Sequence, residues 1–302
     1  MNMNSTTNSR LYAALLWTLL TFILAGCAAS THLQPVGSRD IHVGKGMFGE
    51  IVVSEDAKGL RTLEFERGAG RHSIVKPGDP GHLELEYARI ALVALALCAQ
   101  PPSRILVVGL GGGTLPMLLR AAYPNARIDA AEIDPAVVSV AERYFGFVQD
   151  ERLRAHVGDG RQFIERVSPS TYDVIFLDAF DAKVVPRHLT TQEFLRAVRA
   201  ALRPDGVVVG NLWGPRANAA YYPMLATFRS VFDEIYLVIA QNDVNVMTFA
   251  LPRSAHLSRE QLAAQARALF RPPILRYDLG EIVRKGWIDA VAESRGGTVL
   301  RD

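Results

Sequence analysis

A run of glycines near the middle of the chain has the spacing of a ligand-binding loop. The stretch VVGLGGGTLP, residues 107–116, follows an apolar segment and places four glycines in five positions. Glycines at such a turn let backbone N–H groups and the start of a helix approach a bound group without a Cβ in the way. Gly109, Gly111 and Gly113 fit the spacing G-x-G-x-G, whereas Thr114 replaces the last glycine of the dinucleotide pattern G-x-G-x-x-G. The loop predicts a bound group other than a dinucleotide, although a plain strand-to-helix turn would have the same pattern.

Two acidic residues follow where the next two strands are expected to end. Glu132 comes 19 residues after Gly113, close to the separation at which a carboxylate accepts hydrogen bonds from ribose hydroxyls. Asp159, followed by Gly160, closes the next strand, where its carboxylate could accept from an adenine amino group. Asp-Gly is also a common turn pair, so Asp159 alone is weak support. Sites at successive strand ends on one sheet edge together favour an adenosine-containing ligand.

A pair of aspartates leaves the fourth strand of this region. Asp178 and Asp181 lie three residues apart at the start of a loop in the stretch LDAFDAKVVPRH. One carboxylate there could take a proton from an amine nucleophile while the other binds a cationic group. The alternative is that Asp178 caps a turn and Asp181 is solvated. Because open α/β sheets place functional groups on strand-end loops, we predict Asp178 and Asp181 as the catalytic residues.

These residues require a sheet whose strands end on one side, and the surrounding pattern predicts one. From residue 103 onward, short apolar segments alternate with helical ones, which indicates a doubly wound, mostly parallel α/β sheet. Residues 234–240 and 245–252 are both strand-like, and the connection between them is too short for a parallel crossover. They must pair antiparallel, which predicts a Rossmann-like methyltransferase fold over residues 83–253.

The segments on either side of this domain have other patterns. Residues 45–82 alternate apolar and polar positions and predict a small β-hairpin or meander. Residues 83–99 are expected to open the sheet domain as one helix. Residues 254–302 predict an amphipathic helix followed by a tail on the surface.

The first 27 residues predict an export signal. Arg10 precedes an apolar run over residues 11–25, which is short for a membrane-spanning helix. The run ends in small residues followed by Cys27, an arrangement similar to a bacterial lipoprotein signal in which Cys27 becomes lipidated. Residues 28–44 show no period and predict a tether. We expect an exported, membrane-anchored lipoprotein facing the periplasm, with an uncleaved N-terminal membrane anchor as the alternative.

The composition limits the classes of partner. The chain has 33 Lys and Arg against 31 Asp and Glu, so it lacks the clustered basic excess typical of nucleic-acid-binding proteins. We therefore expect no nucleic-acid partner. No clustered His and Cys spacing indicates a metal site. Association into a homo-oligomer stays open.

Taken together, the motifs resemble the spermidine synthase, or polyamine aminopropyltransferase, family. The resemblance spans roughly residues 49–251 and rests on ILVVGLGGGTL, AAEIDPAVVSVAERYF, GDGRQFI and the segment from YDVIFLDAFD to GVVVGN. It implies decarboxylated S-adenosylmethionine as co-substrate and a diamine such as putrescine as acceptor. It also implies that Glu132 holds the ribose and Asp159 the adenine. Asp178 would then deprotonate the attacking amine, and Asp181 would help to hold the polyamine.

The glycine loop departs from this family. Spermidine synthases usually carry an aspartate within the loop, as G-G-G-D-G-G, which meets the amine of the decarboxylated ligand, and residues 109–113 lack it. The usual Tyr-His/Gln-Glu run appears only as Tyr87-Ala88-Arg89. Two alternatives therefore stay open. One is a methyltransferase that uses intact S-adenosylmethionine, whose carboxylate suits backbone N–H groups, and the other is a catalytically inactive lipid-anchored homologue.

Overall fold

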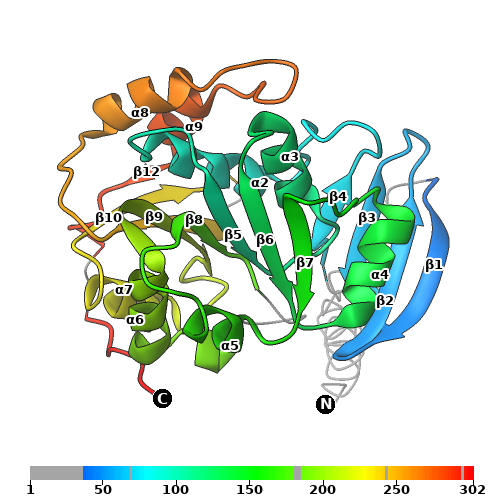
Figure 1. The fold of residues 1–302 in the computed structure, drawn as a ribbon, viewed down its shortest axis with the longest axis horizontal. Helices are drawn as coiled ribbons and strands as arrows, with labels where there is room; N and C mark the ends of the chain where they lie inside the picture. The colour runs from blue at the N-terminus through cyan, green and yellow to red at the C-terminus, as the bar shows by residue number, and fades with distance from the viewer. Residues whose placement is uncertain (1–36, 69, 180–184, 242–243, 294–295) are drawn as a thin grey trace, which may run out of the picture. The chain divides into compact units, whose positions relative to one another are not determined.

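An eight-stranded sheet forms the centre of the protein. The computed structural model describes residues 37–302 apart from 69, 180–184, 242–243 and 294–295, so Cys27, its leader and Asp181 lie outside the described residues. The strand order is β12-β10-β11-β9-β8-β5-β6-β7 (Figure 1). The strands are β5 Arg104–Val108, β6 Arg127–Glu132, β7 Leu153–Val157, β8 Tyr172–Leu177, β9 Leu202–Trp213, β10 Glu234–Ile239, β11 Asn245–Leu251 and β12 Trp287–Ile288.

The strand directions confirm the predicted Rossmann-like methyltransferase fold. β5 pairs parallel with β6 and β8, and β7 and β9 extend the parallel part on either side. β11 runs antiparallel to both β9 and β10, as the short connection between the two segments requires. The carboxyl ends of β5, β6, β7 and β8 therefore lie at one edge of the sheet, and the loops that follow them meet there.

Helices cover both faces of this sheet (Figure 1). The helices α2, α3, α8 and α9 contribute to the apolar core on one face, and α5, α6 and α7 contribute to the core on the other. Their bounds, with that of α4, are α2 Glu86–Ala91, α3 Thr114–Ala122, α4 Pro135–Tyr144, α5 Gly160–Glu165, α6 Gln192–Ala201, α7 Tyr221–Arg229, α8 Arg259–Arg267 and α9 Leu279–Gly286. Ile105 and Val107 of β5 face the first core and Leu106 and Val108 the second, which explains the wholly apolar sequence of this central strand.

The helix expected over residues 83–99 is wrong in extent. The α-helix α2 ends at Ala91 and continues as a 3-10 helix, η1 (Leu92–Ala96). Every residue from Leu92 to Leu95 is buried, so this segment has no polar face and its sequence shows no helical period. Packing on all sides determines its conformation.

A separate antiparallel sheet precedes the main one, and its order is β1-β2-β3-β4. Its strands are β1 Arg39–Gly46, β2 Gly49–Glu55, β3 Arg61–Phe65 and β4 Ser73–Val75, which confirms the predicted meander. β1 corrects the expected tether, because it begins at Arg39, inside residues 28–44. Its residues carry little alternation of their own, and pairing with β2, including the ion pair between Arg39 and Glu55, fixes them as a strand.

The last part of the chain is more closely packed than its sequence indicates. The predicted helix forms as α8, which Ser258 and Gln261 start with a capping box. The expected surface tail contains α9, whose Leu279 and Val283 are buried in the main core, and β12, which pairs with β10. α9 and β12 are too short to show a clear period, which is why the pattern alone does not reveal them.

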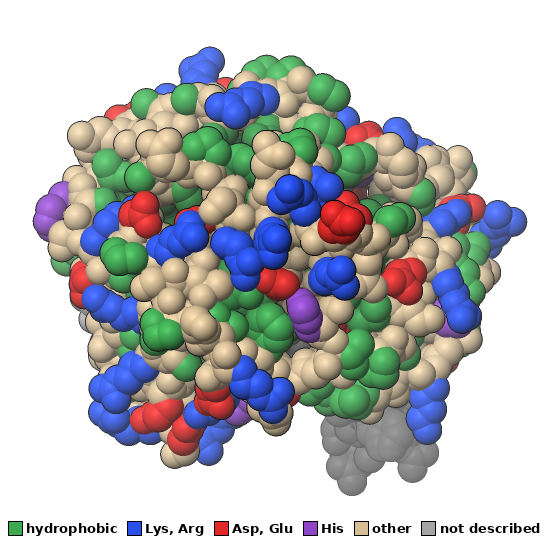
Figure 2. All heavy atoms as spheres, in the orientation of Figure 1, with side chains coloured by type: hydrophobic (Ala, Val, Ile, Leu, Met, Phe, Trp, Pro, Cys, Tyr) green, Lys and Arg blue, Asp and Glu red, His purple; other side chains and the backbone are tan. Residues whose placement is uncertain are grey.

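Side chains of both charges are spread over the surface. On the face shown in Figure 2, Lys and Arg side chains are interspersed with Asp and Glu, and apolar and other side chains lie between them. Within the described ranges of the chain, no helix is long and apolar enough to cross a lipid bilayer.

Candidate functional site

The glycine loop between β5 and α3 requires its glycines. Gly109, Gly111 and Gly113 have φ values of +97°, +53° and +75°, in the left-handed region that favours glycine. A Cβ on Gly109 would lie 2.3 Å from the backbone oxygen of Asp178, so the loop and the end of β8 are in close contact. The predicted spacing of these glycines therefore has a direct structural reason, which is the close approach of two strand-end loops.

Backbone N–H groups of the loop are engaged within the protein. Gly109, Leu110, Gly112 and Gly113 each donate a hydrogen bond. Their acceptors are, in order, the carbonyl oxygen of Ala131 at 2.8 Å, Oε2 of Glu132 at 2.9 Å, Oγ of Ser73 at 2.9 Å and the carbonyl oxygen of Leu110 at 2.9 Å. These four donors are not free to meet a ligand carboxylate. The loop instead offers close backbone approach.

Glu132 lies directly against this loop at the carboxyl end of β6. It is buried, and besides accepting from Leu110 its Oε1 accepts from the N–H of Asp134 at 3.0 Å. Burial raises the pKa of Glu132, and the backbone hydrogen bonds oppose that rise. A third backbone hydrogen bond comes from Gly111, and a carboxylate has about four lone-pair sites, so the side chain can still accept a ribose hydroxyl while it holds the loop.

Asp159 is the N-cap of α5, at the carboxyl end of β7. Its Oδ1 accepts from the N–H of Gln162 at 2.9 Å, and its Oδ2 lies 2.8 Å from Nε2 of His188. These hydrogen bonds outweigh the effect of burial and lower the pKa of Asp159, so the carboxylate is charged. Gly160 lies so close to β5 that a Cβ there would be 2.4 Å from Val108 Cγ1. The bond from His188 was not expected, since nothing in the sequence connects residues so far apart.

Asp178 follows β8 at the same sheet edge. Nδ2 of Asn211, on β9, donates to its Oδ1 at 2.9 Å. Burial raises the pKa of Asp178 to about 6, although hydrogen bonding by Asn211 and Tyr87 opposes the rise. Such a carboxylate is ionised at neutral pH and still basic enough to accept a proton from an ammonium group. Asp181, its predicted partner, lies outside the described residues.

A pocket that is partly open to solvent lies beside Asp178 and the glycine loop. The wall is largely apolar and includes Leu110 and Met247, while Tyr87 and Ser73 contribute hydroxyl groups. Among the described residues that line it, the charged ones are Glu84 and Asp178, both acidic. The cavity therefore suits a chain of methylene groups that carries positive charge. The sequence reasoning missed Glu84 and Asn211. The signal that could have indicated these two residues is their position, Glu84 near the start of a helix and Asn211 near the end of a strand.

The structure thus brings together most of the predicted site residues. Gly109, Gly111 and Gly113 adjoin Glu132 on one side and Asp178 on the other. Asp159 and Gly160 follow the next strand along the same edge. This arrangement can hold a nucleoside over the strand ends while its substituent reaches the acidic cavity.

Known proteins are similar to this chain over most of its length. The model of the spermine/spermidine synthase domain matches residues 86–239. The polyamine aminopropyltransferase of Vibrio vulnificus (strain CMCP6) is 36% identical over 234 residues, which cover 76% of this chain and 77% of that protein. The eEF1A lysine and N-terminal methyltransferase of Homo sapiens is 34% identical over 212 residues, which cover 64% of this chain but only 30% of that protein.

A solved structure shows the same fold. A probable spermidine synthase from Corynebacterium glutamicum superposes with a TM-score of 0.68 over 89% of this chain and 97% of that chain, at 22% identity. That identity supports the fold alone, whereas the domain match and the Vibrio relative identify the family. The chain is a member of the spermine/spermidine synthase family.

Proposed function

We propose that the protein transfers an aminopropyl group from decarboxylated S-adenosylmethionine to a diamine such as putrescine. The observation that carries the proposal is the acidic cavity beside the glycine loop, which has Asp178 in its wall. Both the aminopropyl end of the donor and the acceptor are amines. Membership of the family and the 36% identity to a polyamine aminopropyltransferase support the same reaction.

Asp178 is the base in this reaction. An acceptor ammonium loses a proton to the Asp178 carboxylate, which leaves a neutral amine with a free lone pair. The lone pair attacks the aminopropyl carbon next to the sulfonium, the carbon–sulfur bond breaks, and its electron pair goes to sulfur. The products are a longer polyamine and neutral methylthioadenosine. Because sulfur is already a good leaving group, positioning of the two reactants supplies much of the remaining rate enhancement.

Asn211 keeps this base in position. Its amide donates to Oδ1 of Asp178 and its own Oδ1 accepts from Nδ2 of Asn245 at 3.0 Å. The chain of amides fixes which face of the carboxylate points to the cavity. The remaining lone pairs of Asp178 are then available to an amine.

A second acidic residue lines the cavity that contains Asp178. Glu84 precedes α2 and lines the cavity together with Asp178, although it also lies 3.1 Å from Nε2 of His82. A second carboxylate there favours a ligand with two separated positive charges. The loop N–H groups engaged within the protein disfavour the carboxylate of an intact donor. These features support the decarboxylated donor.

Product analysis tests the proposal. The protein is incubated with decarboxylated S-adenosylmethionine and putrescine, and methylthioadenosine and spermidine are measured by mass spectrometry, with Asp178→Asn as the matched control. We expect both products in equal amounts with the unchanged protein and a loss of about a hundredfold or more with the variant. If methylthioadenosine forms at the same rate with Asp178→Asn, Asp178 is not the base.

A methyltransferase is the second candidate function. The favouring observation is the 34% identity to a methyltransferase whose name specifies amine acceptors, together with the missing loop acid. The same incubation with intact S-adenosylmethionine distinguishes the two. S-adenosylhomocysteine without methylthioadenosine would favour methyl transfer, and no adenosine product with either donor would favour the inactive homologue.

We also propose that the chain is an exported lipoprotein anchored through Cys27. The support is the apolar run of residues 11–25 followed by small residues and Cys27. Expression in a bacterial host with labelled fatty acid should give labelled protein in the membrane fraction. Cys27→Ser should remove the label. Label that persists in Cys27→Ser, or unlabelled wild-type protein, would contradict lipidation at this residue.

A further inference from the structure

Residues 300–302 pack against the loop that carries His188. Each of the three makes a hydrogen bond to another part of the chain. The donor–acceptor pairs are Leu300 N to Thr227 Oγ1 at 2.9 Å, Gln192 N to Leu300 O at 2.8 Å, Arg187 Nη2 to Arg301 O at 3.0 Å, Arg301 Nη1 to Gln192 Oε1 at 2.8 Å and Asp302 N to Glu193 Oε2 at 3.1 Å. The 3-10 helix η2 (Arg187–Leu189) and the start of α6 are thereby tied to this segment, which we call the 300–302 strap.

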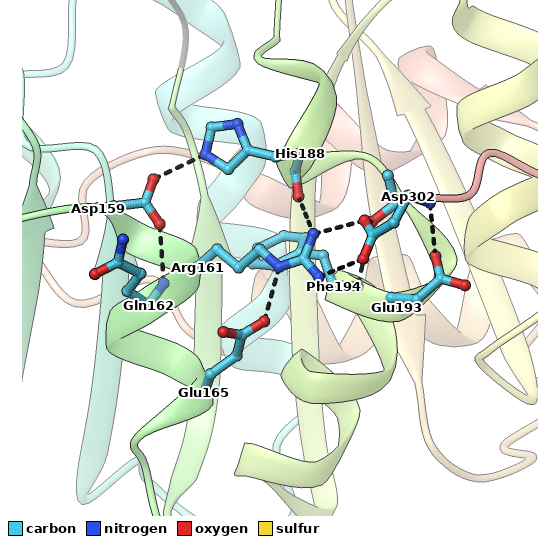
Figure 3. A network of polar contacts seen from close by, with 9 residues as sticks. Asp159, Arg161, Gln162, Glu165, His188, Glu193, Phe194 and Asp302 are labelled. Carbon is cyan, nitrogen blue, oxygen red and sulfur yellow. Dashed lines mark hydrogen bonds and ion pairs between the residues drawn. The ribbon is translucent and has the colours of Figure 1, made fainter.

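Arg161 connects the strap to α5 (Figure 3). Its guanidinium donates to both carboxylate oxygens of Asp302, at 2.7 Å and 2.6 Å, and its Nε donates to Glu165 at 2.7 Å. The Arg161 side chain is only 18% exposed, so the paired contact is partly shielded from water. Thr191 donates to Oδ1 of Asp302 at 2.8 Å, which fixes the carboxylate from the side of α6. Planar two-pronged pairs of this kind restrict orientation as well as distance.

This network leads directly to Asp159. Nη1 of Arg161 donates to the backbone oxygen of His188 at 3.3 Å, and the His188 ring contacts Oδ2 of Asp159 at 2.8 Å. Figure 3 shows the His188 ring turned toward Asp159 while its backbone oxygen faces Arg161. Asp159 also caps α5, the helix on which Arg161 lies. The strap therefore holds the backbone of His188, and the side chain of His188 holds the carboxylate of Asp159.

We propose that Asp302 is a positioning residue for the nucleoside end of the donor site. It fixes Arg161 and His188, and through them it fixes the Asp159 carboxylate that receives the adenine amino group. This inference rests on the proposed function, in which Asp159 holds the adenine. Without the Asp302 carboxylate, Arg161 loses its two-pronged partner and holds the backbone of His188 less firmly.

The chain offers a matched control away from the site. Arg199 donates to both carboxylate oxygens of Asp233, each at 2.9 Å, and Asp233 is about as exposed as Asp302. Asp233 directly precedes β10 and so lies at the amino end of a strand, opposite the edge that holds Asp159. Removing one carboxylate charge at Asp233 therefore repeats the chemical change of Asp302 without reaching the donor site.

Calorimetry with methylthioadenosine, the nucleoside product, tests the inference on the full chain. We expect Asp302→Asn to raise its Kd about fivefold, and Asp233→Asn to leave the Kd within about twofold, as for partly exposed pairs. Asp302→Glu should recover most of the lost affinity. Because neither reacting atom touches the strap, kcat and the KM of the amine should stay near their wild-type values, while the KM of the donor rises.

Each other outcome counts against the inference. An unchanged Kd in Asp302→Asn, or an equal rise in Asp233→Asn, would show that Asp302 only stabilises the fold. If Asp302→Asn is unfolded at the assay temperature, Arg161→Lys replaces it, since lysine keeps the charge but not the two-pronged contact. If the wild-type chain binds neither methylthioadenosine nor S-adenosylhomocysteine, the donor site itself is refuted, which is distinguishable from a site that binds but ignores Asp302.

Discussion

Replacing Asp178 with asparagine should stabilise the unliganded protein while removing its activity. Asparagine has nearly the shape of aspartate and can still accept the hydrogen bond from Asn211. The change therefore removes a charge without creating a void. A group that the fold keeps for its chemistry at the expense of stability should behave in this way.

The size of the effect follows from the pKa of Asp178. Burial raises this pKa from 3.8 to about 6, so the folded protein holds the proton in a range where the unfolded chain has released it. The contribution of Asp178 to the free energy of unfolding is fully present below about pH 4 and is lost as the pH rises through 6. The rise of about two pKa units corresponds to about 3 kcal/mol at most. Because the residue retains some exposure toward the cavity, we expect about 2 kcal/mol.

Thermal unfolding at two pH values measures the gain in stability of Asp178→Asn. At pH 8, Asp178→Asn should raise Tm by about 4–8 °C, and at pH 4 the gain should nearly vanish. In parallel, kcat of the variant should fall by about a hundredfold or more. For the unchanged protein, kcat/KM should increase as the pH rises through about 6, since the carboxylate must be ionised to accept a proton.

Asp173 on β8 is a control for which the expected change in stability at pH 8 has the opposite sign. Its carboxylate is partly buried, but hydrogen bonds from Ser103, Arg104 and Arg203 outweigh burial and lower its pKa. Asp173→Asn should therefore destabilise the protein at pH 8. If Asp178→Asn lowers Tm at pH 8, or if its gain in Tm is the same at pH 4, burial of the Asp178 charge does not destabilise the protein.

Three further predictions concern the residues around the cavity. Glu132→Gln should weaken methylthioadenosine binding by about tenfold in calorimetry, because the neutral amide accepts more weakly from Leu110 and from ribose; unchanged affinity would remove Glu132 from the donor site. Gly109→Ala should destabilise the protein by about 2 kcal/mol or more in chemical unfolding, since its Cβ would overlap the backbone oxygen of Asp178, and a neutral result would contradict the close packing of these loops. Glu84→Gln should raise the KM of putrescine about threefold to tenfold with little change in kcat, whereas an equal effect on a monoamine acceptor would show that Glu84 does not bind a second amine.

The fold class and the directions of the strands could be predicted because each signal is local. The apolar run of β5 and the short connection between β10 and β11 are properties of neighbouring residues, and they suffice to define the fold. The same holds for the glycine loop and for Asp159 at the start of α5. Burial on all sides of η1 and the brevity of α9 removed the periodic signal there.

The contacts that define the site chemically could not be predicted. Asn211 on Asp178, Ser73 on the glycine loop and His188 on Asp159 join residues far apart in the sequence. Their residue types are common, and no spacing connects them. The direction in which the pKa of Asp178 is shifted likewise depends on how deeply the end of β8 is buried, which the sequence does not specify.

The most direct test of the account is a comparison of the two donors by calorimetry. The cavity has acidic charged residues among its described lining, and four N–H groups of the glycine loop are engaged within the protein. Decarboxylated S-adenosylmethionine should therefore bind at least about tenfold more tightly than the intact compound, whose carboxylate would face Glu84 and Asp178 with no cationic side chain among the described lining residues. Equal binding, or tighter binding of intact S-adenosylmethionine, would contradict aminopropyl transfer at this site.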